Sequence, residues 1–197
     1  MCLMPPLGDI ANAVRAKRPE RIPVVLERAE VAAILRELNG VHWLVACLMY
    51  GSGLRLLEAL RLRVKDVEFS RRAVLVRNGK GAKDRVTTLA DSLIEPLQVH
   101  LKGIGLAHRK DLADGFGSVY LPYALARKYP NAPFEWGWQY LFPAANRSTD
   151  PRSGEVRRHH VGEQAVQRAI KRAVRRAGIT KPASSHSLRH SFATHLL

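Results

Sequence analysis

The feature that most constrains the fold is the run VHWLVACLMY at residues 41–50, which is apolar on nearly every side. A helix with apolar residues all around has to lie at the centre of a domain, with other elements packed against each face. The run is about half the length that a membrane-spanning helix needs. We therefore expect a central buried helix with the rest of the chain arranged around it.

Helical spacing of apolar residues continues through most of the remaining sequence. It predicts helices within the segments 27–38, 55–67, 91–102, 104–113, 120–133 and 161–179, and a last helix from Ser187 onward. Two short β-branched runs, AVLVR and RVTTL, flank the glycine-rich NGKGAKD and predict a β-hairpin. In FEWGWQYLF, aromatic residues at every second position predict an extended segment with one aromatic face. The fold class expected is α+β, mainly α, with a small antiparallel sheet.

The charge of the chain indicates a class of partner, and its cysteine content indicates a cellular compartment. The chain has 32 Lys and Arg against 17 Asp and Glu, a formal charge of +15. Such an excess favours a polyanion, most often nucleic acid, although a solubility surface or a ribosome-like tail is the alternative. Two cysteines make no disulfide framework, and the first residues resemble no signal peptide, so we expect a cytoplasmic protein without membrane contact.

Three short motifs carry groups suited to phosphate chemistry. In HSLRH, His186 and Arg189 stand near a helix start, where a guanidinium can bind a phosphate and an imidazole can move a proton. In GSGLRLLEAL, Arg55 follows a glycine turn and Glu58 can orient it. In NGKGAKD, the hairpin lysine Lys80 can reach into a groove. Taken singly, each has a plain alternative: a solvated helix end, a structural ion pair and a solvated turn lysine.

In their order, GLRLLEAL, GKGAKDR and HSLRHSFATHLL resemble the catalytic domain of the tyrosine recombinases, the lambda-integrase-like family. LPYALARKYPNAPFEWGWQYLFP and DPRSGEVRRHH resemble the region that marks the integron integrases within that family. The resemblance implies a mainly α tyrosine-recombinase catalytic domain over residues 24–197, incomplete at its C-terminus. Residues 1–23 would then be a remnant of an interdomain linker.

The resemblance also implies a mechanism. Family members cut DNA with a tyrosine, form a 3′-phosphotyrosyl bond, and use no metal and no other cofactor. By their matching positions, Arg55 and Arg189 would hold the phosphate and Glu58 would support Arg55. Lys80 would protonate the leaving 5′ oxygen, and His186 would transfer a proton or hold the phosphate. His190 and His195 match the motif as structural residues.

The nucleophile is the part that the resemblance does not supply here. In the family it follows the HSLRH motif, and no tyrosine of this chain stands after that motif. We therefore expect a fragment, truncated at both ends, that cleaves no DNA alone. The full-length protein would form homo-tetramers on DNA, through a C-terminal helix that docks into a neighbour, whereas the fragment would be monomeric.

The implied partner is DNA, including recombination sites folded from a single strand into a hairpin with unpaired bases. We call residues 121–143 and 150–160, the two stretches that resemble the integron integrases, the added region. Its rings and basic side chains are the candidates for contact, although alternating aromatic residues also pack in cores. The predicted DNA-binding residues are Trp138, Pro151, Arg157, Arg158, His159, His160 and Lys83. A non-catalytic DNA-binding module or remnant is the alternative function. A basic RNA-binding or ribosome-associated protein is a third hypothesis, which the ordered Arg–Lys–His–Arg set disfavours.

Overall fold

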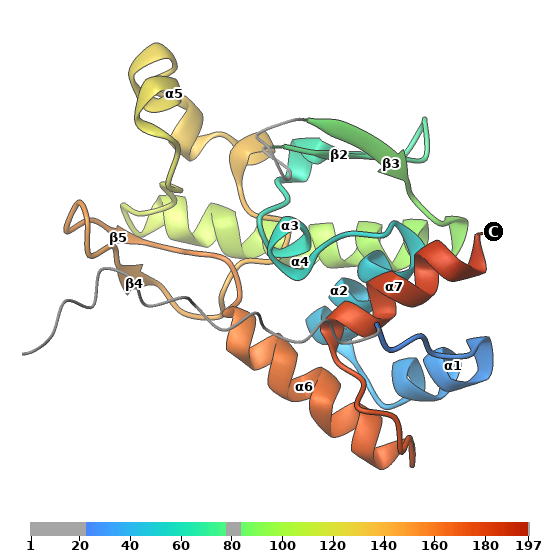
Figure 1. Ribbon diagram of the computed structural model, residues 1–197. Helices are drawn as coiled ribbons and strands as arrows, with labels where there is room; N and C mark the ends of the chain where they lie inside the picture. The colour runs from blue at the N-terminus through green and yellow to red at the C-terminus, as the bar shows by residue number, and fades with distance from the viewer. Residues whose placement is uncertain (1–22, 78–83, 197) are drawn as a thin grey trace, which may run out of the picture.

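The computed structural model describes residues 23–77 and 84–196. The linker expected at residues 1–23 therefore lies almost entirely outside the described part of the chain. The helices are α1 (Arg28–Arg36), α2 (Gly40–Gly51), α3 (Leu56–Leu60), α4 (Ile94–Ala113), α5 (Tyr123–Lys128), α6 (Glu163–Arg176) and α7 (Ser185–His195). The strands are β1 (Val67–Glu68), β2 (Ala73–Val76), β3 (Arg85–Thr88), β4 (Ser148–Thr149) and β5 (Val156–Arg157). The predicted class, mainly α with small antiparallel sheets, is confirmed (Figure 1).

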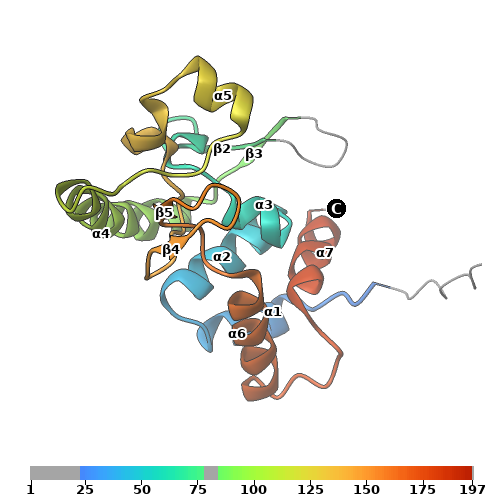
Figure 2. The same ribbon diagram turned by 90° about the vertical axis from the view of Figure 1, so that its left-hand side faces the viewer.

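Helix α2 lies at the centre of the fold, as its apolar sequence predicts. Val45, Ala46, Leu48 and Met49 are completely buried. The helix packs against α1, α3, α6 and α7, which surround it in Figures 1 and 2. Burial on all sides explains why this run has almost no polar residue, and it fixes where α3 and α7 lie relative to one another.

The predicted hairpin is also present. Strand β2 lies in the middle of an antiparallel sheet of order β1-β2-β3, and Val74 is opposite Thr87. The alternation of the two strands turns Val74 and Val76 into the core and leaves Val86 exposed. The hairpin tip, which carries Lys80 and Lys83, lies outside the described residues.

Helix α4 corrects one sequence expectation. Two helices were expected at 91–102 and 104–113, but a short 3₁₀ turn at Asp91–Leu93 leads directly into one helix that includes Gly103. Glycine costs a helix interior only about 1 kcal/mol relative to alanine. The helix is packed on both sides of Gly103, because Leu97 is completely buried and Gly105 lies against the ring of Trp136.

The aromatic segment corrects a second expectation, because it is not extended. It forms two 3₁₀ turns, Ala132–Phe134 and Trp136–Trp138. The side-chain amide of Gln139 donates hydrogen bonds to backbone carbonyls, including that of Pro133 at 2.9 Å, and so ties the turns together. The spacing of the aromatic residues thus reflects successive tight turns and not the pleat of a strand.

A second, smaller core lies beneath this added region. Val119, Leu121, Ala132 and Tyr140 are buried there, with Trp138 packed against them. Of the helices described, none combines the length and apolar character needed to cross a bilayer.

Candidate functional site

The first part of the site forms at the start of α3. Arg55 caps the helix, and the carboxylate of Glu58 accepts hydrogen bonds from the Arg55 backbone N–H at 2.8 Å and from its Nη1 at 2.7 Å. Gly53 precedes them with φ +62°, and a Cβ at that position would lie 2.5 Å from the ring of Phe192. Glycine is therefore required for α7 to approach this turn.

That approach brings Arg189 from α7 to the same place. Its Nη1 donates to the carbonyl of Gly53 at 2.7 Å and lies 3.5 Å from Oε2 of Glu58. Two arginines that are more than a hundred residues apart in sequence therefore meet at one carboxylate. The structure thus brings together Arg55, Glu58 and Arg189, as the motifs predict.

A third arginine, which the sequence reasoning missed, completes the group. Arg85 at the start of β3 binds both oxygens of Glu58, at 3.0 Å and 2.6 Å. No local pattern connects a strand residue to a helix residue so far away, so sequence periodicity could not find this pair. We call Arg55, Glu58, Arg85 and Arg189 the arginine cluster.

The electrostatics of the cluster keep the carboxylate ionised. Burial alone raises the pKa of Glu58, but hydrogen bonds from Arg85 and from the backbone and side chain of Arg55 outweigh it and lower the pKa to about 2. The pKa of Arg85 is raised by its hydrogen bonds to Glu58. Three guanidinium groups surround one negative charge, so the cluster as a whole is strongly cationic.

The histidines of the HSLRH motif lie on α7. A capping box formed by Ser184 and Ser187 begins this helix, and His186 stands exposed in its first turn, one turn before Arg189. His190 is exposed as well. His195, at the other end of the helix, shares a hydrogen bond of 2.9 Å between its Nδ1 and the hydroxyl of Tyr50.

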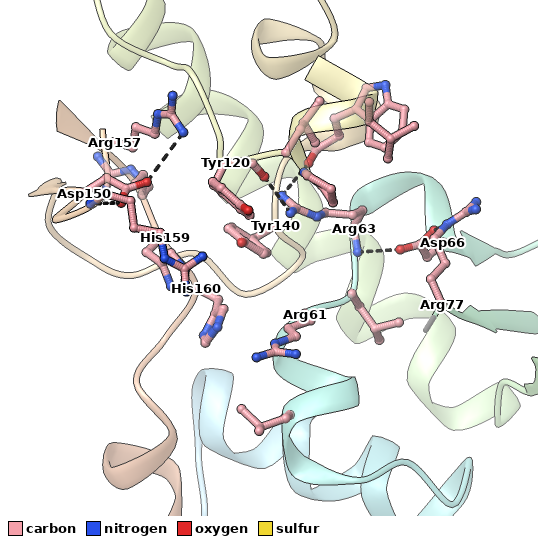
Figure 3. A pocket seen from close by; sticks show the side chains of 18 of the residues that line it. Arg61, Arg63, Asp66, Arg77, Tyr120, Tyr140, Asp150, Arg157, His159 and His160 are labelled. Carbon is pink, nitrogen blue, oxygen red and sulfur yellow. Dashed lines mark hydrogen bonds and ion pairs between the residues drawn. The ribbon is translucent and has the colours of Figure 1, made fainter. Parts of the chain in front are cut away.

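A cleft of about 950 Å³ is lined by Arg55 and Glu58, at the start of α3, and by residues of the added region. Figure 3 shows the part of this cleft around Arg61, Tyr140 and His160. The cleft is open enough for a nucleotide-sized group. Its walls include four of the residues predicted to contact DNA bases, which are Trp138, Pro151, His159 and His160. Arg55 and Glu58 thus share this cleft with those four residues, whereas Arg189 and His186 do not line it.

One wall of this cleft is made of rings. The ring centroids of His159 and His160 are 4.1 Å apart, and each lies 5.3 Å from that of Tyr140. Burial is the main cause that lowers the pKa of both histidines, and the charges of Arg61 and Arg63 lower it further. The two imidazoles are therefore neutral at neutral pH. We call His159, His160 and Tyr140 the ring wall.

Two basic side chains that sequence reasoning did not single out support the aromatic turns. Arg63 donates to the carbonyls of Trp138 and Tyr120, each at 2.9 Å, and its guanidinium lies 3.7 Å from the centre of the Tyr140 ring. The ammonium of Lys65 lies 2.7 Å from the centre of the Trp138 ring. One face of Trp138 is therefore covered by a cation.

The two arginines predicted to bind DNA in this region are already paired. Arg158 binds Asp111 through Nε at 2.6 Å and Nη2 at 2.8 Å. Arg157 binds Glu155, with Nε 2.8 Å from Oε2, and lies 3.6 Å from Asp150. Their side chains line the cleft, but much of their charge is balanced within the chain. In the described residues, no group of three or more side chains is arranged to hold a metal ion.

Comparison with known proteins defines the class. Residues 24–197 match the phage integrase family, and the chain belongs to this family of tyrosine recombinases. The family predicted from the motifs is thus confirmed. The chain is 52% identical over 183 residues to an integrase/recombinase of Escherichia coli, covering 93% of this chain and 54% of that protein. It is 30% identical over 182 residues to the tyrosine recombinase XerA of Pyrococcus horikoshii, covering 92% and 50%.

Solved structures agree with this assignment. The crystal structure of a XerA recombinase superposes with a TM-score of 0.56 at 25% identity, covering 94% of this chain and 53% of that chain. The XerH site-specific recombinase bound to a palindromic difH substrate gives a TM-score of 0.55 at 21% identity, covering 91% and 43%, and supports the fold alone. The chain spans about half the length of the curated relatives it matches.

Proposed function

We propose that this domain acts in site-specific DNA recombination, by cleavage and rejoining of DNA strands through a phosphotyrosine intermediate. The observation that carries the proposal is the meeting of Arg55 and Arg189 at Glu58. Two guanidinium groups side by side suit the non-bridging oxygens of a scissile phosphate, whose charge grows in the transition state. The named relatives, which are integrases and recombinases, support the same reaction.

The remaining roles follow the family motif. His186 is exposed one helical turn before Arg189 on α7 and is proposed to transfer a proton or hold the phosphate. Lys80, outside the described residues, is proposed to protonate the leaving 5′ oxygen. The nucleophile is proposed to be none of the tyrosines of this chain, because none follows the HSLRH motif. In addition, the Tyr50 hydroxyl shares a hydrogen bond with His195, and Tyr140 is buried in the ring wall.

The finer proposal is an integron integrase that binds recombination sites folded from single-stranded DNA. The cleft supports it, because neutral rings adjoin the cationic cluster: a phosphate can lie at one end and an unpaired base at the other. Base–ring stacking contributes about 1–3 kcal/mol per base. Trp138, Pro151, His159 and His160 are the proposed base contacts. Arg157 and Arg158 would contribute less to DNA binding than two unpaired arginines, because they are already paired with Glu155 and Asp111. On DNA, the full-length protein would assemble as a homo-tetramer.

A binding measurement tests the proposal. We compare the affinity of the chain for a DNA hairpin with unpaired bases and for the same stem fully paired, at fixed salt. The proposal predicts tighter binding of the hairpin, and roughly tenfold weaker binding of both DNAs by Arg55→Gln and Arg189→Gln. Equal affinity for the two DNAs would contradict the integron assignment. Unchanged binding by both variants would contradict the phosphate role.

The alternative function is a non-catalytic DNA-binding module, and a cleavage assay separates the two for this chain. Incubated with a nicked duplex, the 197-residue chain is expected to form no covalent adduct that survives denaturation. An adduct would show that a tyrosine of this chain is a nucleophile. Tyr120, which lines the cleft, would then be examined first as Tyr120→Phe. Competition with structured RNA at the same salt tests the third hypothesis, an RNA-binding protein.

A further inference from the structure

Arg85 is the last residue of GKGAKDR, and it is the member of the arginine cluster to which neither the sequence analysis nor the proposed function gives a role. Its two terminal nitrogens face the two oxygens of Glu58, with Nη1–Oε1 at 3.0 Å and Nη2–Oε2 at 2.6 Å. The Glu58 side chain is only 10% exposed. This parallel, two-bond arrangement is the geometry in which an arginine binds a carboxylate most strongly. Both terminal nitrogens of the Arg85 guanidinium are therefore engaged by Glu58.

The guanidinium groups of Arg55 and Arg189 contact Glu58 less completely. Arg55 reaches Glu58 with Nη1 alone, at 2.7 Å. Arg189 lies farther from the acid, at 3.5 Å, and gives its short hydrogen bond to the carbonyl of Gly53. Within the described ranges, the other side-chain N–H groups of Arg55 and Arg189 have no hydrogen-bond partner. Both guanidinium groups thus keep donors that an anion can use.

We propose that Arg85 is a positioning residue that occupies both oxygens of Glu58 and so keeps the donors of Arg55 available for a phosphate that Arg55 binds together with Arg189. The inference rests on the proposed phosphate-binding role of those two arginines. Arg55 and Glu58 are one helical turn apart, where a carboxylate and a guanidinium readily pair. Without Arg85, the nearest remaining side-chain donor to Oε2 of Glu58 besides Arg55 is Nη1 of Arg189 at 3.5 Å, so the Arg55 guanidinium meets only a weak competitor for that oxygen. Arg55 would then close on Glu58 and lose donors that face the phosphate.

The test follows anion binding by the chain itself. Inorganic sulfate serves as the probe, because it imitates a phosphate dianion without titrating near neutral pH. The arginine Nε–H signals are followed by NMR during the titration, and they report both the affinity and which arginines respond. In the wild-type chain the Arg55 and Arg189 signals should move, and Arg55→Gln should weaken binding about tenfold.

The variants of Arg85 decide its role. Arg85→Gln should weaken sulfate binding to a similar extent and abolish the response of Arg55. Arg85→Lys should not restore binding, because a lysine keeps the charge but cannot make the two parallel hydrogen bonds. The double variant of Arg55→Gln with Arg85→Gln should bind no more weakly than Arg55→Gln. Arg71→Gln is the matched control, because it loses one charge from an exposed pair with Glu68 and should bind normally.

Other outcomes would overturn the inference. Full restoration by Arg85→Lys would show that Arg85 acts as a simple positive charge, and additive losses in the double variant would show that it binds the anion directly. An unchanged affinity in Arg55→Gln would remove the phosphate role itself and the inference with it. Should Arg85→Gln lose its dispersed signals on unfolding, the folded lysine variant with weakened sulfate binding remains the expected result, and normal binding contradicts it.

Discussion

Arg55 and Glu58 of the arginine cluster stand at one end of the cleft and the ring wall stands at the other, and the two are built by opposite means. In the arginine cluster, three cations surround one carboxylate, and charge–charge hydrogen bonds as short as 2.6 Å hold the side chains. In the ring wall, His159, His160 and Tyr140 are held by ring contacts, and the Nδ1 of His160 shares a hydrogen bond of 2.7 Å with a backbone carbonyl. One end is ionised and stays so, and the other is kept neutral by burial and by nearby arginines.

The difference matches what each end is proposed to bind. A phosphate is bound best by fixed cations, whereas an unpaired base is bound by neutral, flat surfaces. A protonated imidazole in the ring wall would attract any phosphate of the DNA and would weaken the distinction between the two ends. Arg61 and Arg63 help to keep the two ends different, because their charge opposes protonation of His159 and His160.

The largest effect is expected from removal of the shared acid. Glu58→Ala leaves three guanidinium groups close together without a counter-charge, and we expect it to lower the free energy of unfolding by about 3 kcal/mol. Chemical denaturation measures the change. The control is Glu68→Ala, which removes an acid that is 50% exposed from its pair with Arg71, and which should cost less than about 1 kcal/mol. Equal losses would show that the cluster is not a special electrostatic unit.

A smaller effect, confined to the other end, is expected for Arg63→Met. The variant removes two hydrogen bonds to backbone carbonyls and the contact with the Tyr140 ring, so it should destabilise the fold by about 2 kcal/mol. It should also reduce the preference for the DNA hairpin while sulfate binding at the arginine cluster stays unchanged. Arg71→Met, which loses an arginine from an exposed pair with Glu68, is the control. Weakened sulfate binding would show that the two ends do not act separately.

Sequence reasoning was most successful where a pattern is local or repeated. The apolar run of α2, the two hairpin strands and the Arg55–Glu58 spacing all report contacts within a few residues or a uniform environment. The bidentate Arg85–Glu58 pair and the Arg158–Asp111 pair join distant segments, and nothing in either neighbourhood indicates the partner. The aromatic segment was misread because successive 3₁₀ turns produce the same alternation of residue types as a strand.

The stability of the fold should fall with pH in two steps, one for each end of the cleft. Because burial and nearby arginines lower the pKa of His159 and His160 in the fold, the unfolded chain binds protons more readily, and stability falls as the pH drops below about 6.5. Glu58, with a pKa of about 2 against 4.5, stabilises the fold above pH 4.5, by about 3 kcal/mol, and that contribution is lost between pH 4.5 and 2.

Denaturation curves at several pH values check these steps. His160→Gln should make the step below pH 6.5 shallower and leave the acidic step unchanged. His100, whose pKa burial also lowers, should retain part of the first step in that variant. Asp111, whose pKa is lowered chiefly by its hydrogen bond from Arg158, contributes to the acidic step together with Glu58. A slope unaltered by His160→Gln would contradict a ring wall kept neutral by the fold.

The smallest effect concerns Arg61, which lies between the two ends. It is exposed at the end of α3, lines the cleft, and faces His160 in Figure 3. Arg61→Gln should lower the salt dependence of DNA binding by about one unit in the slope of log K against log salt, for hairpin and paired stem alike. The same slope measured for Arg168→Gln, on the exposed face of α6, is the control.

The hairpin and the paired stem together decide to which end Arg61 belongs. A side chain that only contacts a phosphate lowers both affinities equally, because the backbone is common to the two DNAs. A loss confined to the hairpin would place Arg61 functionally with the ring wall, acting through the neutrality of His160. In that event the pKa of His160, measured by NMR, should rise in Arg61→Gln, since one of the charges that lowers it has been removed. An equal loss for both DNAs would instead extend the cationic end of the cleft by one residue.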